Sequence, residues 1–317
     1  MEKITCHIRR FDGEKVWFQE YELPYEKGKT LLWALTKIKE ELDPTFNFTS
    51  ACGHAICGSC GVRVNNHPFL VCKTSLDEIL ETFHTSLLKF EPLGNFKVIR
   101  DLVIDWKPKI EKMHTIKPWL FPNEQGDKTS GFNQSEEEYK RISLSTDCVL
   151  CGICASECEQ LTVNQDGYLE PFILNRAFRF AVDSRDGEAE KHIEPLLEND
   201  LWKCVHCMHC VSHCPKTIPL TEEVAFLRQA TMKMGERNNK GARHAYAFHD
   251  DVKQNGRLNE MTLPIKTEGL VRTLSRIPFA LRLVRKGKIN LLQLPKKIEG
   301  IEDVRKIYQY VQEMNEE

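Results

Sequence analysis

The distribution of apolar side chains predicts strands first and helices afterwards. Residues 4–8 and 16–18 place apolar side chains at alternate positions, which predicts two strands near the N-terminus. After Gly28 the period changes, and one face of a predicted helix carries Leu31, Leu35, Ile38 and Leu42. Residues 62–64 and 69–71 alternate again around an Asn-Asn pair, which favours a hairpin.

The later part of the chain has a helical period. Residues 168–183 place apolar side chains on one face after Pro171, and a second helix after Pro219 ends at Gly235. No apolar stretch approaches the ~20 residues needed to span a bilayer. The first residues lack the basic-then-apolar pattern of an export signal. We therefore expect no transmembrane segment and no signal peptide of the chain's own.

The composition is that of a globular protein large enough for two domains. Of its 317 residues, 41% are hydrophobic and 28% are charged. The 44 basic residues nearly balance the 46 acidic ones, which leaves a formal net charge of -2. This balance argues against a protein that wraps nucleic acid, so we expect no nucleic-acid partner.

Cysteines indicate the chemistry of the chain. Twelve of the 13 fall in three groups of four, and most spacings within a group are too short for sensible disulfide pairing. We therefore expect the thiolates of each group to converge on metal centres. The remaining cysteine, Cys6, lies on an alternating strand and is expected to be a small buried hydrophobic residue.

The first group has the plant-type spacing of a [2Fe–2S] site. Its members are Cys52, Cys57, Cys60 and Cys72, in the order C-x4-C-x2-C and then a distant fourth cysteine. Intervening glycines let the backbone approach the sulfides and adopt positive φ. Zinc is the alternative, but zinc ligands usually come as two C-x2-C pairs. Two strands, a helix and then this loop follow the order of a β-grasp ferredoxin.

The second and third groups both have the C-x2-C-x2-C-x3-C spacing of two-cluster bacterial ferredoxins, in which the fourth cysteine ligates the other cluster. One [4Fe–4S] cluster is therefore assigned to Cys148, Cys151, Cys154 and Cys214. The other [4Fe–4S] cluster is assigned to Cys158, Cys204, Cys207 and Cys210. Because the ligands cross between distant segments, cluster binding and folding should be coupled. His206, His209 and His213 lie among these ligands and either tune the cluster or simply pack beside it.

In this combination of motifs the chain resembles the iron–sulfur subunits of succinate dehydrogenases and fumarate reductases. Shorter similarities lie between the motifs, at residues 98–105, 116–120, 168–171, 183–186 and 214–216. The resemblance implies an α+β protein. Its expected parts are a β-grasp plant-type [2Fe–2S] ferredoxin domain at 1–105, an all-α bacterial-type two-cluster ferredoxin domain at 106–240 and an extension at 241–317.

The resemblance implies electron transfer without catalytic residues in this chain. In the family a separate flavoprotein subunit holds FAD and the dicarboxylate site. The iron–sulfur subunit relays electrons between that subunit and the quinone pool. No glycine-rich dinucleotide fingerprint follows a strand here, and the redox chemistry belongs to cofactors that the protein positions.

Three departures from the family pattern narrow this interpretation. Most members have no ligand at the position of Cys207 and hold a [3Fe–4S] cluster, so a second [4Fe–4S] cluster is expected here in its place. Residues 159–163 follow Cys158 where most members have a proline and a tryptophan-rich quinone pocket, so that pocket is not expected. The usual chain also ends near residue 240, whereas this one continues to 317.

The extension is basic and amphipathic in its middle. Residues 271–297 contain no Asp or Glu, and their basic residues are Arg272, Arg276, Arg282, Arg285, Lys286, Lys288, Lys296 and Lys297. Interleaved apolar residues indicate docking onto a partner protein or onto anionic lipid headgroups. A solvated helix packed on its own domain is the alternative. We favour a partner protein, because a chain without a quinone pocket needs another route for its electrons.

These departures match the E-type variant of the family, in which a cysteine-rich subunit resembling heterodisulfide reductase replaces the membrane-spanning subunits. The 8-methylmenaquinol:fumarate reductases are the nearest group. The resemblance implies a complex with an FAD flavoprotein and the cysteine-rich subunit, passing electrons from methylmenaquinol to fumarate in anaerobic respiration. It would lie peripherally on the cytoplasmic membrane. The periplasmic face is favoured, through co-export with a signal-bearing flavoprotein, and the cytoplasmic face is the alternative.

Other functions stay open at this point. The chain also suits a thiol- or heterodisulfide-linked reductase with a separate cysteine-rich partner, or a conventional succinate:quinone reductase. A molybdenum-hydroxylase small subunit shares the spacing of the first group but would carry a second [2Fe–2S] domain, so we exclude it. A zinc-held scaffold would be colourless, whereas iron–sulfur clusters are brown.

Overall fold

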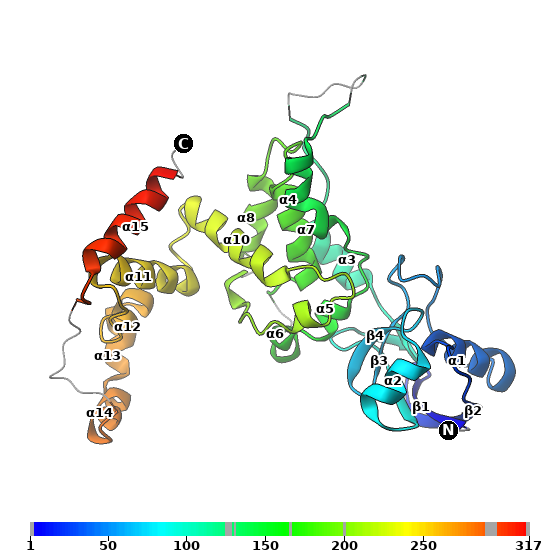
Figure 1. Cartoon of the computed structure of the whole chain (residues 1–317). Coiled ribbons are helices and arrows are strands. Elements are labelled where there is room, and N and C mark those ends of the chain that lie inside the picture. The colour runs from blue at the N-terminus through cyan, green and yellow to red at the C-terminus, as the bar shows by residue number, and fades with distance from the viewer. Residues whose placement is uncertain are drawn as a thin grey trace. The chain divides into compact units, whose positions relative to one another are not determined.

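The computed structural model describes the chain except for residues 1–2, 124–128, 130, 165–166, 199–200, 289–296 and 315–317. It divides into two compact units, Met1–Thr231 and Met232–Glu317. In the first unit a five-stranded sheet near the N-terminus is followed by a group of helices (Figure 1). In the second unit, the regular elements among the described residues are all helices.

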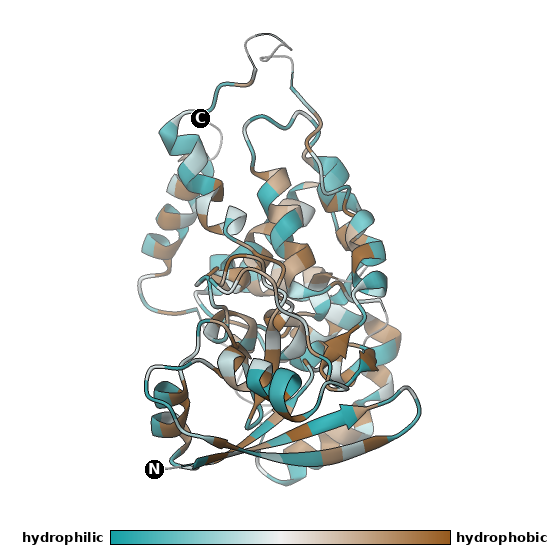
Figure 2. Cartoon of the chain, turned by 90° about the vertical axis from the view of Figure 1, so that its right-hand side faces the viewer, coloured by the Kyte–Doolittle hydropathy of each residue, from teal (hydrophilic) through white to brown (hydrophobic). Residues whose placement is uncertain are grey.

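The sheet has the strand order β2-β1-β5-β3-β4. Its strands are β1 (Lys3–Phe11), β2 (Val16–Pro24), β3 (Gly61–Val64), β4 (His67–Leu70) and β5 (Leu87–Glu91). Strands β1 and β2 form an antiparallel hairpin, whereas β1 and β5 are parallel. Helix α1 (Leu31–Lys37) lies between β2 and β3 in the chain, and α2 (Leu76–Phe83) lies between β4 and β5. The alternation of hydrophobic and hydrophilic bands along the strands is visible in Figure 2.

The predicted core of this sheet is partly confirmed. Ile4, Cys6 and Ile8 are fully buried, so Cys6 is a core residue as expected. Val16 and Phe18, by contrast, are 51% and 41% exposed. Strand β2 lies at the edge of the sheet, and only its second half is buried in the core.

The helix expected to continue through Leu42 changes its hydrogen bonding instead. After α1 the chain forms a π-helical segment, η1 (Ile38–Leu42), in which the amide of Asp43 donates to the carbonyl of Ile38 at 2.7 Å. The wider turn of a π-helix moves the following residue off the face set by an α-helical period. Leu42 is consequently 51% exposed rather than buried.

A buried ionic network holds the chain that leads into the first cysteine loop. The Arg10 guanidinium donates to Asp101 at 2.9 Å and to Asp43 at 2.5 Å. Asp101 also accepts from the amide of Asn47 at 2.8 Å. Arg10 and Asp101 are 2% and 1% exposed. These hydrogen bonds therefore connect strand β1 both to the end of η1 and to the segment just before Cys52.

Beyond the sheet the first unit is built mainly from helices. A short hairpin, β6 (Val98–Arg100) and β7 (Val103–Ile104), leads into them. The helices are α3 (Lys107–His114), α4 (Glu136–Thr146), α5 (Ile153–Ser156), α6 (Glu159–Val163), α7 (Pro171–Ala181), α8 (Glu190–Glu198), the 3-10 turn η2 (Leu201–Lys203), α9 (His209–Ser212) and α10 (Leu220–Lys233). Among these helices α7 contributes the most buried residues, and its Phe172, Ile173 and Leu174 are at most 1% exposed.

The second unit contains five described helices: α11 (Lys240–Asn255), α12 (Leu263–Glu268), α13 (Leu270–Ser275), α14 (Ile277–Arg285) and α15 (Ile301–Met314). Buried Asp251 in α11 accepts hydrogen bonds from Lys266 Nζ at 2.5 Å and from the amide of Asn259 at 3.1 Å. Helices α12 and α15 both pack against α11, and α13 and α14 continue in sequence from α12 (Figure 1). Among the described residues, no helix is long and apolar enough to cross a membrane.

Candidate iron–sulfur sites

Three cysteines of the first group lie on an irregular loop between η1 and β3, and the fourth, Cys72, follows β4. Cys52 Sγ accepts hydrogen bonds from the amides of His54 at 3.4 Å, Ile56 at 3.3 Å and Cys57 at 3.3 Å. The amide of Ala55 donates to Cys72 Sγ at 3.2 Å, so the fourth cysteine lies against the same loop. Several loop residues, including Gly53, Ala55 and Gly58, have positive φ, which points successive amides inward.

The thiols of this loop differ in acidity. The Ser59 hydroxyl and the amide of Cys52 lower the pKa of Cys57 to about 6. Burial raises the pKa of Cys60 to about 12, and its Sγ lies 3.3 Å from that of Cys72. The loop therefore presents both a ready thiolate and a thiol that gives up its proton only when a metal replaces it.

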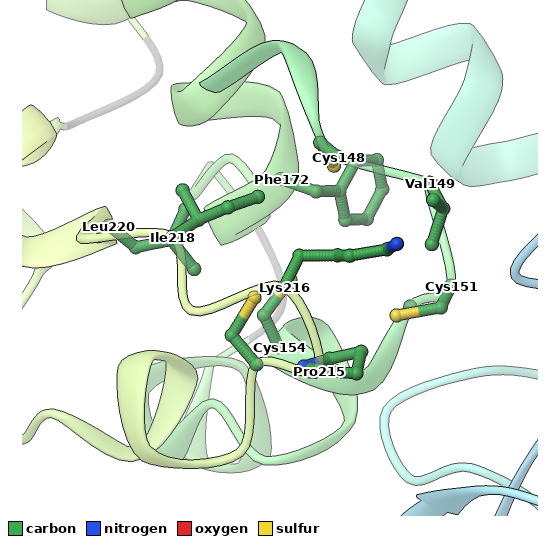
Figure 3. A pocket seen from close by; sticks show the side chains of 11 residues that line it. Cys148, Val149, Cys151, Cys154, Phe172, Pro215, Lys216, Ile218 and Leu220 are labelled. Carbon is green, nitrogen blue, oxygen red and sulfur yellow. The ribbon is translucent and has the colours of Figure 1, made fainter. Parts of the chain in front are cut away.

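The second site is a cavity of about 360 Å³, part of it open to solvent. Four cysteines line it, namely Cys148, Cys151, Cys154 and Cys214, together with apolar residues such as Phe172. Lys216 extends toward the same space (Figure 3). Burial raises the pKa of Cys151 to about 12 and that of Cys154 well above its usual value.

The third site is a neighbouring cavity of about 410 Å³, also partly open to solvent. Its four cysteines are Cys158, Cys204, Cys207 and Cys210. Each of the two cavities thus takes three cysteines from one sequence group and one from the other. Leu220 lines both cavities, so the two cavities are adjacent.

The first and second sites meet at a glycine. A Cβ atom on Gly58 would lie 2.4 Å from the carbonyl oxygen of Val149 and 3.0 Å from Cα of Cys151. The loop that carries the first group therefore touches the backbone that carries the second. The Asn95 side chain strengthens this junction, since its Nδ2 donates to the carbonyls of Ala155 at 2.9 Å and Ser156 at 3.1 Å.

Arg228 is a structural residue that the sequence analysis missed. It lies on α10, and its Nη2 donates to the carbonyls of Cys204 at 2.6 Å and Trp202 at 3.2 Å. Its guanidinium carbon lies 4.8 Å from the centre of the Trp202 ring, and Nη1 lies 3.0 Å from His206 Nε2. Burial and the charge of Arg228 lower the pKa of His206. No local spacing links Arg228 to Cys204, so only the fold brings the two together.

His209 and His213, the other two histidines near the third site, lie at its surface. His209 Nδ1 is 3.4 Å from a carboxylate oxygen of Glu159, and both side chains are about half exposed. His213 Nδ1 lies 2.9 Å from the carbonyl oxygen of His209. Neither histidine lines the cavity, whereas His206 does.

The donor sets suit iron–sulfur clusters. Each cavity is ringed by four cysteines and otherwise lined largely by apolar side chains, and thiolates are the ligands that such clusters take. In the first loop, amides point at sulfur, which is how a protein stabilises a negatively charged cluster. Among the described residues, no group of three His, Cys, Asp or Glu is arranged to hold a single metal ion.

Two family models match the chain in the regions of these sites. A 2Fe-2S iron-sulfur cluster binding domain matches residues 5–111, and a 4Fe-4S dicluster domain matches residues 145–218. The first match includes the first group of cysteines, and the second match includes the second and third groups.

Related proteins extend the similarity beyond the motifs. The 8-methylmenaquinol:fumarate reductase iron-sulfur subunit of Wolinella succinogenes is 44% identical over 306 residues, covering 95% of this chain and 96% of the relative. The fumarate reductase iron-sulfur subunit of Haemophilus influenzae is 34% identical and covers 62% of this chain and 80% of its own length. Among solved structures, a chain of the Mycobacterium smegmatis Sdh1 complex in the apo form shares the fold, with a TM-score of 0.67, 21% identity and coverage of 74% of this chain and 98% of that one.

Proposed function

The chain belongs to the family of fumarate reductase and succinate dehydrogenase iron–sulfur subunits, and we propose that it relays electrons through one [2Fe–2S] and two [4Fe–4S] clusters in a quinol:fumarate reductase. As a family member it is an electron-transfer component of an oxidoreductase. The clusters supply one-electron redox chemistry when bound. The residues of the chain would hold the clusters and set their order.

The succession of the three sites is the observation that carries this proposal. The first loop touches the second site where Gly58 meets Val149, and the second and third cavities share Leu220. Each site is thus adjacent to the next along one path through the first unit. We assign the [2Fe–2S] cluster to the loop of Cys52, the first [4Fe–4S] cluster to the cavity of Cys148 and the second to that of Cys158.

We propose that the third site binds a [4Fe–4S] cluster in place of the family's usual [3Fe–4S]. Cys207 lines the cavity together with three other cysteines, so a fourth thiolate is available for the fourth iron. The Cys207 side chain is exposed. An exposed ligand leaves a cluster at this site accessible to a partner that exchanges electrons with it.

The partners are proposed from the name of the Wolinella relative and from the surface at the third site. That relative is a subunit of an 8-methylmenaquinol:fumarate reductase, so we propose a flavoprotein with FAD at the fumarate end and a cysteine-rich subunit at the quinol end. Val163, Val205 and Met208 are 84%, 64% and 49% exposed. Val205 and Met208 line the third cavity, and apolar side chains exposed together favour contact with a partner. We place the complex peripherally on the cytoplasmic membrane, with the periplasmic face favoured.

Anaerobic purification of the tagged chain from its host tests the proposal. Mass spectrometry of the stoichiometric partners should identify a flavoprotein and a cysteine-rich subunit. The isolated complex should oxidise a reduced methylmenaquinone analogue with fumarate as acceptor. A haem-containing multi-span partner would instead indicate a conventional succinate:quinone reductase. A stoichiometric [3Fe–4S] electron paramagnetic resonance signal in the anaerobically oxidised protein would contradict the assignment at Cys207.

A further inference from the structure

The basic segment, defined here as residues 270–288, exposes nearly all of its apolar side chains. Leu270, Val271 and Leu274 of α13 are 60%, 85% and 52% exposed. In α14, Phe279 and Leu281 are 60% and 50% exposed. No residue of α13 or α14 is buried. These two helices therefore contribute nothing to the core of the second unit, and their apolar surface has no cover within the described residues of the chain.

The polar side of the same segment is purely cationic. Between Gly269 and Lys288 the sequence contains no Asp or Glu. In α14, Ile277, Leu281 and Val284 share one face, because they are spaced by four and three residues, while Arg282 and Arg285 share the adjacent face. Lys286 and Lys288 follow directly and are exposed. Arg276 is the exception, since it pairs with Glu268 at 3.0 Å.

We propose that the basic segment binds an anionic phospholipid bilayer, with α14 lying in the plane of the membrane surface. An exposed apolar face beside a row of Arg and Lys without acidic neighbours is the pattern of interfacial helices. The apolar side chains insert among the lipid acyl chains, and the cations bind the lipid phosphates. The described helices are too short to span a bilayer. This inference goes beyond the relay function and does not depend on it.

The structure favours lipid over the partner protein that the sequence analysis preferred for this region. A protein partner recognised through so many cations needs matching carboxylates at fixed positions. A bilayer provides diffuse negative charge and apolar depth together, which suits a helix that exposes an apolar face beside Arg and Lys side chains. Lys296, part of the basic stretch in the sequence, lies outside the described residues.

Vesicle flotation with the intact, cluster-loaded chain tests the inference. The chain should bind vesicles of phosphatidylcholine mixed with phosphatidylglycerol, bind pure phosphatidylcholine weakly, and dissociate as salt is raised. Each cationic side chain near an anionic surface is worth about a fivefold change in affinity. The variant R282Q/R285Q should therefore bind about 30-fold more weakly, and F279S/L281S should lose binding to all vesicles.

The matched control is K253Q/R257Q, which removes the same charge from exposed positions of the second unit outside the basic segment. It should bind within about twofold of the unchanged chain. Circular dichroism and the visible cluster spectrum of all variants should be unaltered, which separates this test from that of the relay function. The inference is overturned if neutral and anionic vesicles bind equally, or if the control weakens binding as much as R282Q/R285Q. The inference is also overturned if the chain does not bind vesicles, and if R282Q/R285Q instead loses a protein that the unchanged chain binds stoichiometrically.

Discussion

Replacement of Gly58 by alanine probes the junction between the first and second sites. Gly58 has φ of +72°, and its added Cβ would lie 2.4 Å from the carbonyl oxygen of Val149 and 3.0 Å from the backbone of Cys151. All of these neighbours are backbone atoms, so no flexible side chain can move aside. The loop of the first site or the segment of the second must shift.

The expected cost has two parts. A left-handed conformation costs an L-residue about 1–2 kcal/mol, and overpacking against fixed atoms costs about 1–3 kcal/mol more. Gly53→Ala is the matched control, because Gly53 has φ of +69° in the same loop but its Cβ would meet nothing within 4 Å. The control should thus show the backbone penalty alone, while Gly58→Ala should lose about 2–5 kcal/mol in total.

Anaerobic thermal unfolding, followed by circular dichroism and by bleaching of the visible cluster absorption, measures the difference. At about 2–4 °C per kcal/mol for a unit of this size, Gly58→Ala should melt about 2–12 °C below Gly53→Ala. Spin coupling between the first and second clusters should also weaken only in Gly58→Ala. Equal melting temperatures for the two variants would refute the proposed contact between the sites.

Four further predictions concern other parts of the molecule. Burial raises the pKa of the Glu223 carboxyl, so folding favours the protonated form and its contribution to stability is lost as pH rises through the raised pKa. Glu223→Gln should therefore raise the melting temperature at neutral pH and flatten its decline between acid and neutral pH, whereas an unchanged pH profile would contradict the assignment. Arg10→Ala leaves Asp101 buried without its cation and should lower the free energy of unfolding by about 3–5 kcal/mol in urea titrations; a loss below about 1 kcal/mol would show that the network is dispensable. Cys207→Ala should convert the third cluster to a [3Fe–4S] form, detected by electron paramagnetic resonance after anaerobic oxidation, with the other two signals unchanged. Removal of iron by a chelator should unfold the helices around the second and third sites, and reconstitution should become faster as pH rises because buried thiols such as Cys151 must lose their protons; recovery independent of pH would argue against that order of events.

The spacing of the cysteines and the period of the apolar residues were sufficient to predict the candidate ligands and several of the elements. Three groups of four cysteines at local spacings restrict the chemistry, because a loop of a few residues can place several thiolates around one cluster whatever surrounds it. The period of the apolar residues was sufficient to predict strand β1, in which Cys6 is buried, and the buried face of α7. The chain's family membership rests on similarity along nearly its full length.

Only the tertiary structure decided how these local pieces meet. The exposure of Leu42 and Phe18 follows from a π-helical turn and from an edge position in the sheet, neither of which an alternating or helical period contains. Gly58 contacts Val149, and Arg228 donates a hydrogen bond to the carbonyl of Cys204, although both pairs are far apart in the chain. Such contacts depend on the packing of whole elements rather than on the preferences of neighbouring residues. The sequence by itself therefore predicted which cysteines group together as candidate ligands, whereas the packing of sheet and helices determined that the three sites lie next to one another.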